Sequence, residues 1–180
     1  MAPDDLLNNV SRRTFLKISA IWTGGAWIVG IPGLSTQNYN VLTREEADIM
    51  DLLADCMIPP DDFAGGKEAG VTNFIDQQIG KNGYLTEDRD LYKTCLPALN
   101  RTPLEEYKKH FLTLDQDTRI EYLKKIENGF YDRSIAVEIW EPFTPSHFFA
   151  KMRDQCMMGF YGSPKHGGNN NYVSYRMIRF

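Results

Sequence analysis

The side chains that could carry acid–base, nucleophilic or metal chemistry are few and scattered in this chain of 180 residues. The three histidines, His110, His147 and His166, lack the H-x-x-x-H spacing that places two metal ligands on one face of a helix. No G-x-S-x-G motif is present to activate a serine. We therefore predict that the chain has no catalytic residue and no metal site of its own.

Sequence signals for a bound cofactor are also missing. Gly65-Gly66 and Gly167-Gly168 have neither the spacing nor the preceding strand of a dinucleotide-binding turn. No C-x-x-C-H motif is present for covalent haem attachment. Asp61, Asp62 and Glu68 lack the close alternation of oxygen ligands in a calcium loop, so we interpret them as solvated. We expect no cofactor in this chain.

The cysteines, Cys56, Cys95 and Cys156, are far apart in the sequence and form no C-x-x-C pair. In an oxidising compartment two of them could form a disulfide and leave the third over. Alternatively, all three are small buried apolar residues. The sequence leaves both alternatives open.

Composition favours one globular domain. Hydrophobic residues make up 42% of the chain and aromatic residues 12%, enough to bury a core. The formal net charge is −4 and the pI is about 5.4. A nucleic-acid-binding protein needs a basic face, so we expect no nucleic-acid partner.

The N-terminal segment has the pattern of a twin-arginine export signal, and no charged residue occurs between Lys17 and Arg44. The apolar stretch is short and diluted by glycines, whereas a membrane-spanning helix needs about 20 apolar residues. We predict a signal peptide over residues 1–35, folded as a signal helix, with an uncleaved membrane anchor as the alternative. The residues of the signal are Ser11, Arg12, Arg13, Phe15, Leu16 and Lys17.

Repeated helix-start signals after this segment predict an all-α fold, a single small helical domain over residues 36–180. Thr43 to Glu46 forms a capping box, and Asp115 and Thr144-Pro145 are further N-terminal signals. The expected helices cover residues 44–58, 73–79, 87–95, 103–111, 116–128 and 146–158, the second and fourth opened by Thr72 and Thr102. A short strand is possible over residues 135–140, and residues 159–180 are expected to form loops.

Aromatic residues are dense in the C-terminal third of the chain. We expect most of them in the core, although aromatic side chains are also enriched at the centres of protein interfaces. The residues are Phe130, Tyr131, Trp140, Phe143, Phe148, Phe149, Phe160 and Tyr161.

Two segments carry a resemblance to a known family. Residues 54–76 resemble the A-D-x-x-I-P … A-G-V-x-x-F-I-D signature of the gluconate 2-dehydrogenase subunit 3 family, and residues 159–169 are similar to its C-terminal G-x-Y-x-x-P-x-Y-G-G-N. His166 stands where that family usually has tyrosine. The resemblance implies that the motif residues form a partner-docking surface. These residues are Ile58, Pro59, Ala69, Gly70, Val71, Phe74, Ile75, Asp76, Tyr161, Pro164, Gly167, Gly168 and Asn169.

The resemblance implies a small, non-catalytic subunit of a dehydrogenase at the periplasmic face of the inner membrane. In such complexes a large subunit carries FAD and oxidises gluconate or a related sugar or sugar acid, and a cytochrome c subunit carries haem c and passes electrons to quinone. The small subunit is expected to help the flavoprotein fold and to accompany it through the twin-arginine translocase. The alternatives are a stand-alone periplasmic metalloprotein or enzyme that uses His147 and His166, and a membrane-anchored binding module.

Overall fold

The computed structural model of this chain describes residues 38–133 and 135–178. Within these residues the secondary structure consists of α-helices and short 3₁₀ helices, with no strand, so the predicted all-α class is confirmed. The export signal and the signal helix predicted over residues 1–35 lie outside the described residues. No described helix is long and apolar enough to cross a membrane.

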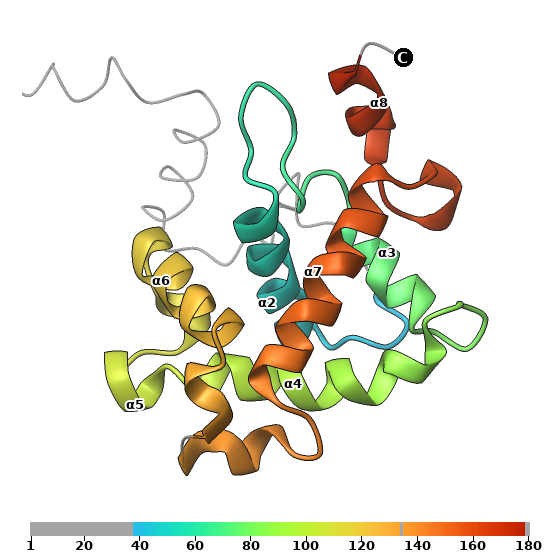
Figure 1. Ribbon diagram of the computed structural model, residues 1–180. Coiled ribbons are helices and arrows are strands. Elements are labelled where there is room, and N and C mark those ends of the chain that lie inside the picture. Colours follow the sequence, from blue (N-terminus) through green and yellow to red (C-terminus); the bar gives the residue numbers. More distant parts are fainter. Residues whose placement is uncertain (1–37, 134, 179–180) are drawn as a thin grey trace, which may run out of the picture. The chain divides into compact units, whose positions relative to one another are not determined.

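Short 3₁₀ helices lie between several of the α-helices along the chain (Figure 1). The α-helices are α2 (Arg44–Met57), α3 (Val71–Gln78), α4 (Arg89–Arg101), α5 (Leu104–Tyr107), α6 (Gln116–Glu127), α7 (Pro145–Tyr161) and α8 (Val173–Met177). The 3₁₀ helices are Thr86–Asp88, Phe111–Thr113, Phe130–Arg133, Ile135–Trp140, Pro164–His166 and Asn170–Tyr172.

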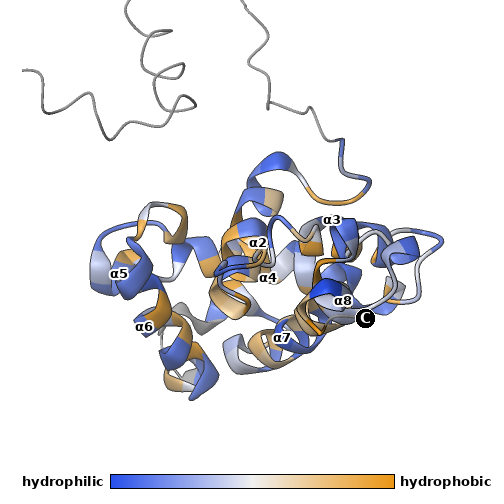
Figure 2. Ribbon diagram, turned by 90° about the horizontal axis from the view of Figure 1, so that it is seen from above, coloured by the Kyte–Doolittle hydropathy of each residue, from blue (hydrophilic) through white to orange (hydrophobic). Residues whose placement is uncertain are grey.

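The long helix α7 lies at the centre of the domain and packs against α2, α3, α4 and α6. Helix α2 also packs against α3 and α4, so α2, α4 and α7 enclose the middle of the core. Figure 2 shows apolar and polar residues on different faces of these helices. Met50, Leu53, Phe148 and Met152 are buried there, as expected for amphipathic helices that cover one core.

The caps predicted for three helices are confirmed. Thr43 Oγ1 accepts a hydrogen bond from the Glu46 backbone N–H, and the Glu46 carboxylate accepts one from the Thr43 N–H over 2.7 Å. Asp115 accepts from the Thr118 N–H at the start of α6, and Thr144 caps α7. Each cap satisfies an N–H group that has no partner within its own helix.

Two predicted caps are wrong. Helix α3 begins at Val71, and the Thr72 hydroxyl instead donates to Asp51 Oδ1 over 2.6 Å. Thr102 Oγ1 donates to the Ala98 carbonyl and accepts from Trp140 Nε1, so it does not cap α5. In both cases a threonine hydroxyl found a tertiary or backbone partner that a local pattern does not reveal.

Helix boundaries differ from the prediction where packing outweighs local signals. Helix α4 continues through Pro97 to Arg101, although proline removes one helical hydrogen bond. Pro97 is exposed, while Leu96 and Leu99 beside it are fully buried, so apolar burial offsets the loss. The helix expected to reach Phe111 ends at Tyr107, and Phe111 starts a separate 3₁₀ helix with its ring buried.

The strand considered over residues 135–140 is also wrong, because Ile135–Trp140 is a 3₁₀ helix. A strand with no neighbour would leave its backbone groups unpaired, whereas a 3₁₀ helix satisfies them locally. The expectation of loops over residues 159–180 is corrected in the same way. Helix α7 continues to Tyr161, and two 3₁₀ helices and α8 follow it.

A chain of buried hydrogen bonds joins α4 to α7. The Tyr92 hydroxyl donates to Gln155 Oε1 over 2.7 Å, and Gln155 Nε2 donates to Asp88 Oδ2 over 2.6 Å. Lys151 Nζ lies 3.2 Å from the other Asp88 oxygen and balances its charge. Burial raises the pKa of Tyr92 well above its ordinary value, so this hydroxyl stays a donor.

We expect Tyr92→Phe to lower the free energy of unfolding by about 1–3 kcal/mol, because the Gln155 side-chain oxygen loses its buried donor. Chemical denaturation followed by circular dichroism measures the change. Tyr84→Phe is the matched control, since the Tyr84 side chain is 55% exposed. Equal effects of the two substitutions would contradict a role for the buried network.

Candidate functional site

The two motif segments, 94 residues apart at one contact, lie side by side in the fold. The Asn73 side-chain amide donates to the Gly167 carbonyl over 2.7 Å, and Gln78 Nε2 donates to the His166 carbonyl over 3.1 Å. The Asn170 backbone N–H donates to the Ala69 carbonyl over 2.9 Å. Helix α3 therefore holds the segment that follows α7 by hydrogen bonds to its backbone.

Glycines make this close approach possible. A Cβ atom added to Gly159 of α7 would lie 2.8 Å from a ring carbon of Phe74 in α3. A Cβ on Gly168 would lie 2.2 Å from the Gly159 carbonyl oxygen. Glycine is required at both positions because any larger residue would push the segments apart.

Asn169 organises the turn between the motif and α8. Its backbone is in the left-handed region, which asparagine tolerates better than most residues, and its side chain is fully buried. The side-chain amide donates to the Gly162 carbonyl over 2.8 Å, and its oxygen accepts from the Ser174 N–H over 3.0 Å. One side chain thus ties the end of α7 to the start of α8.

Asp76 is a buried carboxylate that binds the chain just before α2. Its Oδ2 atom accepts from the Asn40 backbone N–H (2.7 Å) and side-chain amide (3.1 Å). Its Oδ1 atom accepts from the backbone N–H groups of Val41 and Leu42, both at 2.9 Å. Four donors replace the water that the carboxylate loses on burial, so α3 anchors residues 40–42.

The first motif also closes the loop between α2 and α3. Asp55 Oδ1 accepts from the Lys67 backbone N–H over 2.9 Å, and burial raises the pKa of the Asp55 carboxyl above its ordinary value. Lys67 Nζ lies 3.3 Å from Asp51 Oδ2, which completes a link across the loop. A Cβ on Gly66 would lie 2.4 Å from the Ala54 carbonyl oxygen, so the loop packs directly on the end of α2.

The motif residues divide by exposure, and their docking role stays a prediction. Those with buried side chains or backbone are Ala69, Gly70, Val71, Phe74, Ile75, Asp76, Gly168 and Asn169. Those that reach the surface wholly or partly are Ile58, Pro59, Tyr161, Pro164 and Gly167. A partner can touch only the surface residues directly, while the buried residues hold those surface residues in place.

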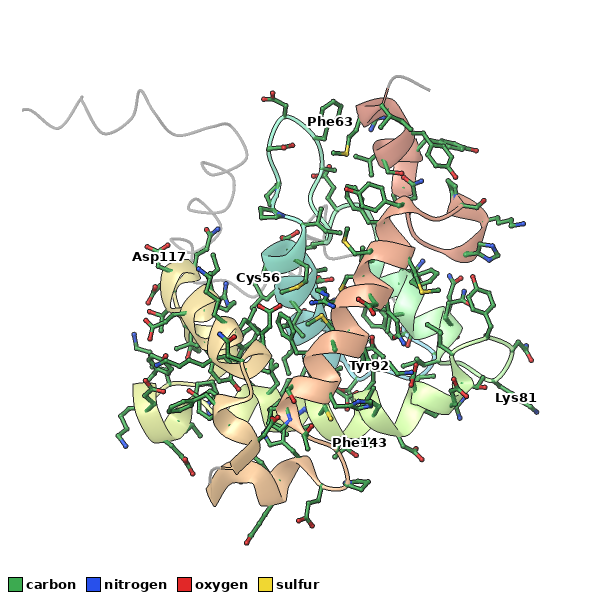
Figure 3. The ribbon with its side chains drawn as sticks, viewed as in Figure 1. Cys56, Phe63, Lys81, Tyr92, Asp117 and Phe143 are labelled. Carbon is green, nitrogen blue, oxygen red and sulfur yellow. The ribbon has the colours of Figure 1, made fainter. Side chains whose placement is uncertain are left out.

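The loop after α2, the last turns of α7, and α8 lie at one end of the domain (Figure 1), and most surface residues of the two motifs belong to these segments or adjoin them. Figure 3 shows Phe63 on that loop. Six of the eight large exposed hydrophobic residues in the described part of the chain lie in the loop after α2, in the last two turns of α7, or at the two caps of α8. We call them the apolar patch: Phe63, Met157, Met158, Tyr161, Tyr172 and Ile178.

The aromatic residues of the C-terminal third are mostly core, as predicted. The buried members are Tyr131, Trp140, Phe148, Phe149 and Phe160. Phe143 is partly buried, whereas Phe130 and Tyr161 are exposed. Only Tyr161 among them belongs to the apolar patch.

The histidines, which could serve in acid–base or metal chemistry, lie apart from one another. His110 Nδ1 is 3.3 Å from the Asn100 carbonyl, His166 packs edge-on against Tyr84, and His147 is at the start of α7. His110 falls within the helix expected over residues 103–111, but it lies between α5 and the 3₁₀ helix Phe111–Thr113. In the described ranges, no three histidine, cysteine or acidic residues come together as a metal site.

All three cysteines are free thiols, which agrees with the second of the two alternatives left open by the sequence. Cys95 and Cys156 are fully buried and Cys56 is partly buried. Burial raises the pKa of Cys95 to about 12 and also raises the pKa of Cys156. Protonated buried thiols behave as small apolar residues rather than nucleophiles.

Sequence reasoning missed the partners of several motif residues. Asp76 is part of the first motif, but the residues it binds lie about 35 positions earlier, in a segment with no distinctive pattern. Asn73 and Gln78 looked like ordinary polar helix residues, yet both bind the second motif. No pattern in the sequence pointed to this role.

Comparison with known proteins identifies one family. Residues 44–180 match the sequence profile of the family described as gluconate 2-dehydrogenase subunit 3, which confirms the resemblance predicted from the two motifs. No curated protein and no solved structure matches the chain. The matched residues include both motif segments and every described helix.

We expect Asp76→Asn to lower the free energy of unfolding by about 2 kcal/mol or more. Asparagine loses the negative charge, and its NH₂ group would face backbone donors instead of accepting from them. Hydrogen exchange read by mass spectrometry should also show faster exchange at residues 40–42. Asp62→Asn, in the exposed loop after α2, is the control, and unchanged exchange at residues 40–42 in Asp76→Asn would refute the anchoring role.

Proposed function

Because the chain belongs to the gluconate 2-dehydrogenase subunit 3 family, we propose that it is the non-catalytic small subunit of a membrane-associated, FAD-dependent dehydrogenase. The complex oxidises gluconate or a related sugar or sugar acid and passes electrons to cytochrome c and quinone. The family match over residues 44–180 is the observation that carries this proposal, since the family's description names a subunit of a dehydrogenase.

The cofactors of the proposed complex belong to its other subunits. FAD is assigned to the large subunit and haem c to the cytochrome subunit. The scattered histidines, the buried thiols and the lack of a strand–glycine–helix turn in the described residues support this division. The role of this chain in the reaction is then to bind and support the flavoprotein.

Export of the flavoprotein is the second part of the proposal. The segment from Ser11 to Lys17 has the twin-arginine pattern, and that pathway carries folded proteins. A large subunit with its FAD already bound would thus reach the periplasm attached to this chain. The complex would then work at the periplasmic face of the inner membrane.

The apolar patch is the proposed docking surface for the large subunit. Exposed aromatic and methionine side chains are typical of interface centres, and isolated soluble domains seldom expose several together. Ile58, Pro59 and Pro164 of the two motifs adjoin the same three segments and present partly exposed apolar surface. The buried motif residues support this surface by fixing how α2, α3 and α7 meet.

We expect the double variant Phe63→Ala, Tyr161→Ala to reduce recovery of the large subunit at least about 10-fold, because large aromatic side chains dominate binding energy at interfaces. Both subunits are co-expressed, and the complex is isolated through a tag on this chain. Phe130→Ala is the matched control, since Phe130 is also exposed but lies outside the patch. Equal recovery with the double variant and the control would refute docking at the patch.

Replacing Arg12 and Arg13 by lysine should leave both this chain and the flavoprotein in the cytoplasm, because the translocase would no longer accept the leader although both positive charges are kept. Cell fractionation with FAD fluorescence and dehydrogenase activity measures where the large subunit resides. Asn9→Gln, a substitution in the leader outside the signal residues, is the control. Normal periplasmic activity in the Arg12, Arg13 variant would contradict the escort role.

A further inference from the structure

A polar pocket of about 620 Å³ opens between Asn40 and Val41, the end of α3 and the start of α4. Its volume lies in the range of small-molecule sites. It is distinct from the apolar patch and contains none of the patch residues. The lining residues are Asn40, Val41, Gln77, Gln78, Gly80, Lys81, Asn82, Gly83 and Arg89.

Several of the pocket walls are held in place by hydrogen bonds. The Asn40 backbone and side chain are bound by Asp76, and Gln78 Nε2 donates to the His166 carbonyl. Arg89 Nε donates to the Ile79 carbonyl over 3.0 Å. A Cβ on Gly83 would lie 1.9 Å from the Gln78 carbonyl oxygen, so the turn is pressed against the end of α3. A pocket built in advance loses little conformational entropy when a ligand binds.

The charge of the lining is one-sided. Lys81 and Arg89 are the charged residues of the lining, which contains no carboxylate. Neither has an ion-pair partner among residues 38–133 and 135–178, although the whole chain has a net charge of −4. The nearby carboxylate of Asp76 already accepts four hydrogen bonds from residues 40–42. The pocket therefore presents two cations without an anion.

The remaining side chains favour hydroxyl groups. Asn40, Gln77, Gln78 and Asn82 contribute primary amides, which both donate and accept hydrogen bonds. A hydroxyl group also does both, so a row of hydroxyls can pair with such amides. Val41 is the single apolar side chain of the lining, which disfavours an aliphatic or aromatic ligand.

From these features we propose that the pocket binds a small carboxylate that carries several hydroxyl groups, the chemical class of a sugar acid. Arg89 and Lys81 bind the carboxylate, and the amides bind the hydroxyls; Lys81 comes from the loop after α3 (Figure 3). This goes beyond the proposed function and does not depend on the apolar patch. It gives the small subunit a ligand site of its own, separate from the active site of the flavoprotein.

The test measures binding to the purified full chain by isothermal titration calorimetry at low salt. D-Gluconate is the probe. Sorbitol has the same carbon chain with a CH₂OH group in place of the carboxylate, and hexanoate has the carboxylate without the hydroxyls. We expect one gluconate site, with sorbitol and hexanoate each at least about 10-fold weaker. Hexanoate or inorganic phosphate binding as tightly as gluconate would overturn the proposal, because the pocket would then be a general anion site.

Variants locate the site. Lys81→Gln and Arg89→Gln should each weaken gluconate binding about 3- to 10-fold. Lys124→Gln removes an exposed lysine of α6 and should change the affinity for gluconate less than about two-fold. Circular dichroism checks that each chain is folded, which matters most for Arg89 because it also binds the Ile79 carbonyl. No gluconate binding by the folded chain, or equal effects of Lys81→Gln and Lys124→Gln, would also overturn the proposal.

A second measurement uses the assembled complex, in which the flavoprotein is a gluconate-binding partner. Hydrogen exchange of the small subunit with and without gluconate should show slower exchange over residues 77–89, but not in a complex carrying Lys81→Gln. Unchanged exchange over these residues in the wild-type complex would count against the pocket. The apolar-patch variants should leave gluconate binding by the isolated chain unaltered, so failure of docking and failure of this inference are distinguishable.

Discussion

Helix α3 and the end of α7 approach so closely that Gly159 lies against the ring of Phe74, and much of the structure depends on this contact. With the two helices at this distance, Asn73 and Gln78 can reach backbone carbonyls of the segment after α7. That segment then turns at Asn169 and returns to α7 as α8. A side chain at position 159 would separate the helices, because a close-packed interior has no space to absorb it.

Buried charge imposes a second constraint on the arrangement. Asp76 and Asp88 are both buried, and each is satisfied by groups from distant parts of the chain. Asp76 accepts hydrogen bonds from residues 40–42, while Asp88 is bound by Lys151 and Gln155 of α7. A buried carboxylate without such partners would be costly, so these contacts favour one arrangement of the helices over others.

The two motifs therefore combine two physical roles. Most of their residues are buried or form turns, and they determine how α2, α3 and α7 meet. A smaller set, including Pro59 and Tyr161, lies at the surface beside the exposed apolar residues. A sequence signature that identifies a family can thus be largely a signature of its buried scaffold.

The sequence by itself determined the helical class, the caps at Thr43, Asp115 and Thr144, and the family. These features depend on residues close together in the chain, such as the reciprocal pairing of Thr43 with Glu46. The separation of most aromatic residues into the core also followed from composition. The leader pattern is likewise local.

Tertiary structure decided the features whose partners are distant. Helix α4 passes through Pro97 because Leu96 and Leu99 are buried by other helices, and Thr72 and Thr102 bind groups outside their own turns. The anchoring of residues 40–42 by Asp76 and the polar pocket beside them likewise require segments brought together by folding. Local patterns predict the hydrogen bonds available within one or two helical turns. They do not predict which distant donor or apolar surface will be present when the chain is folded.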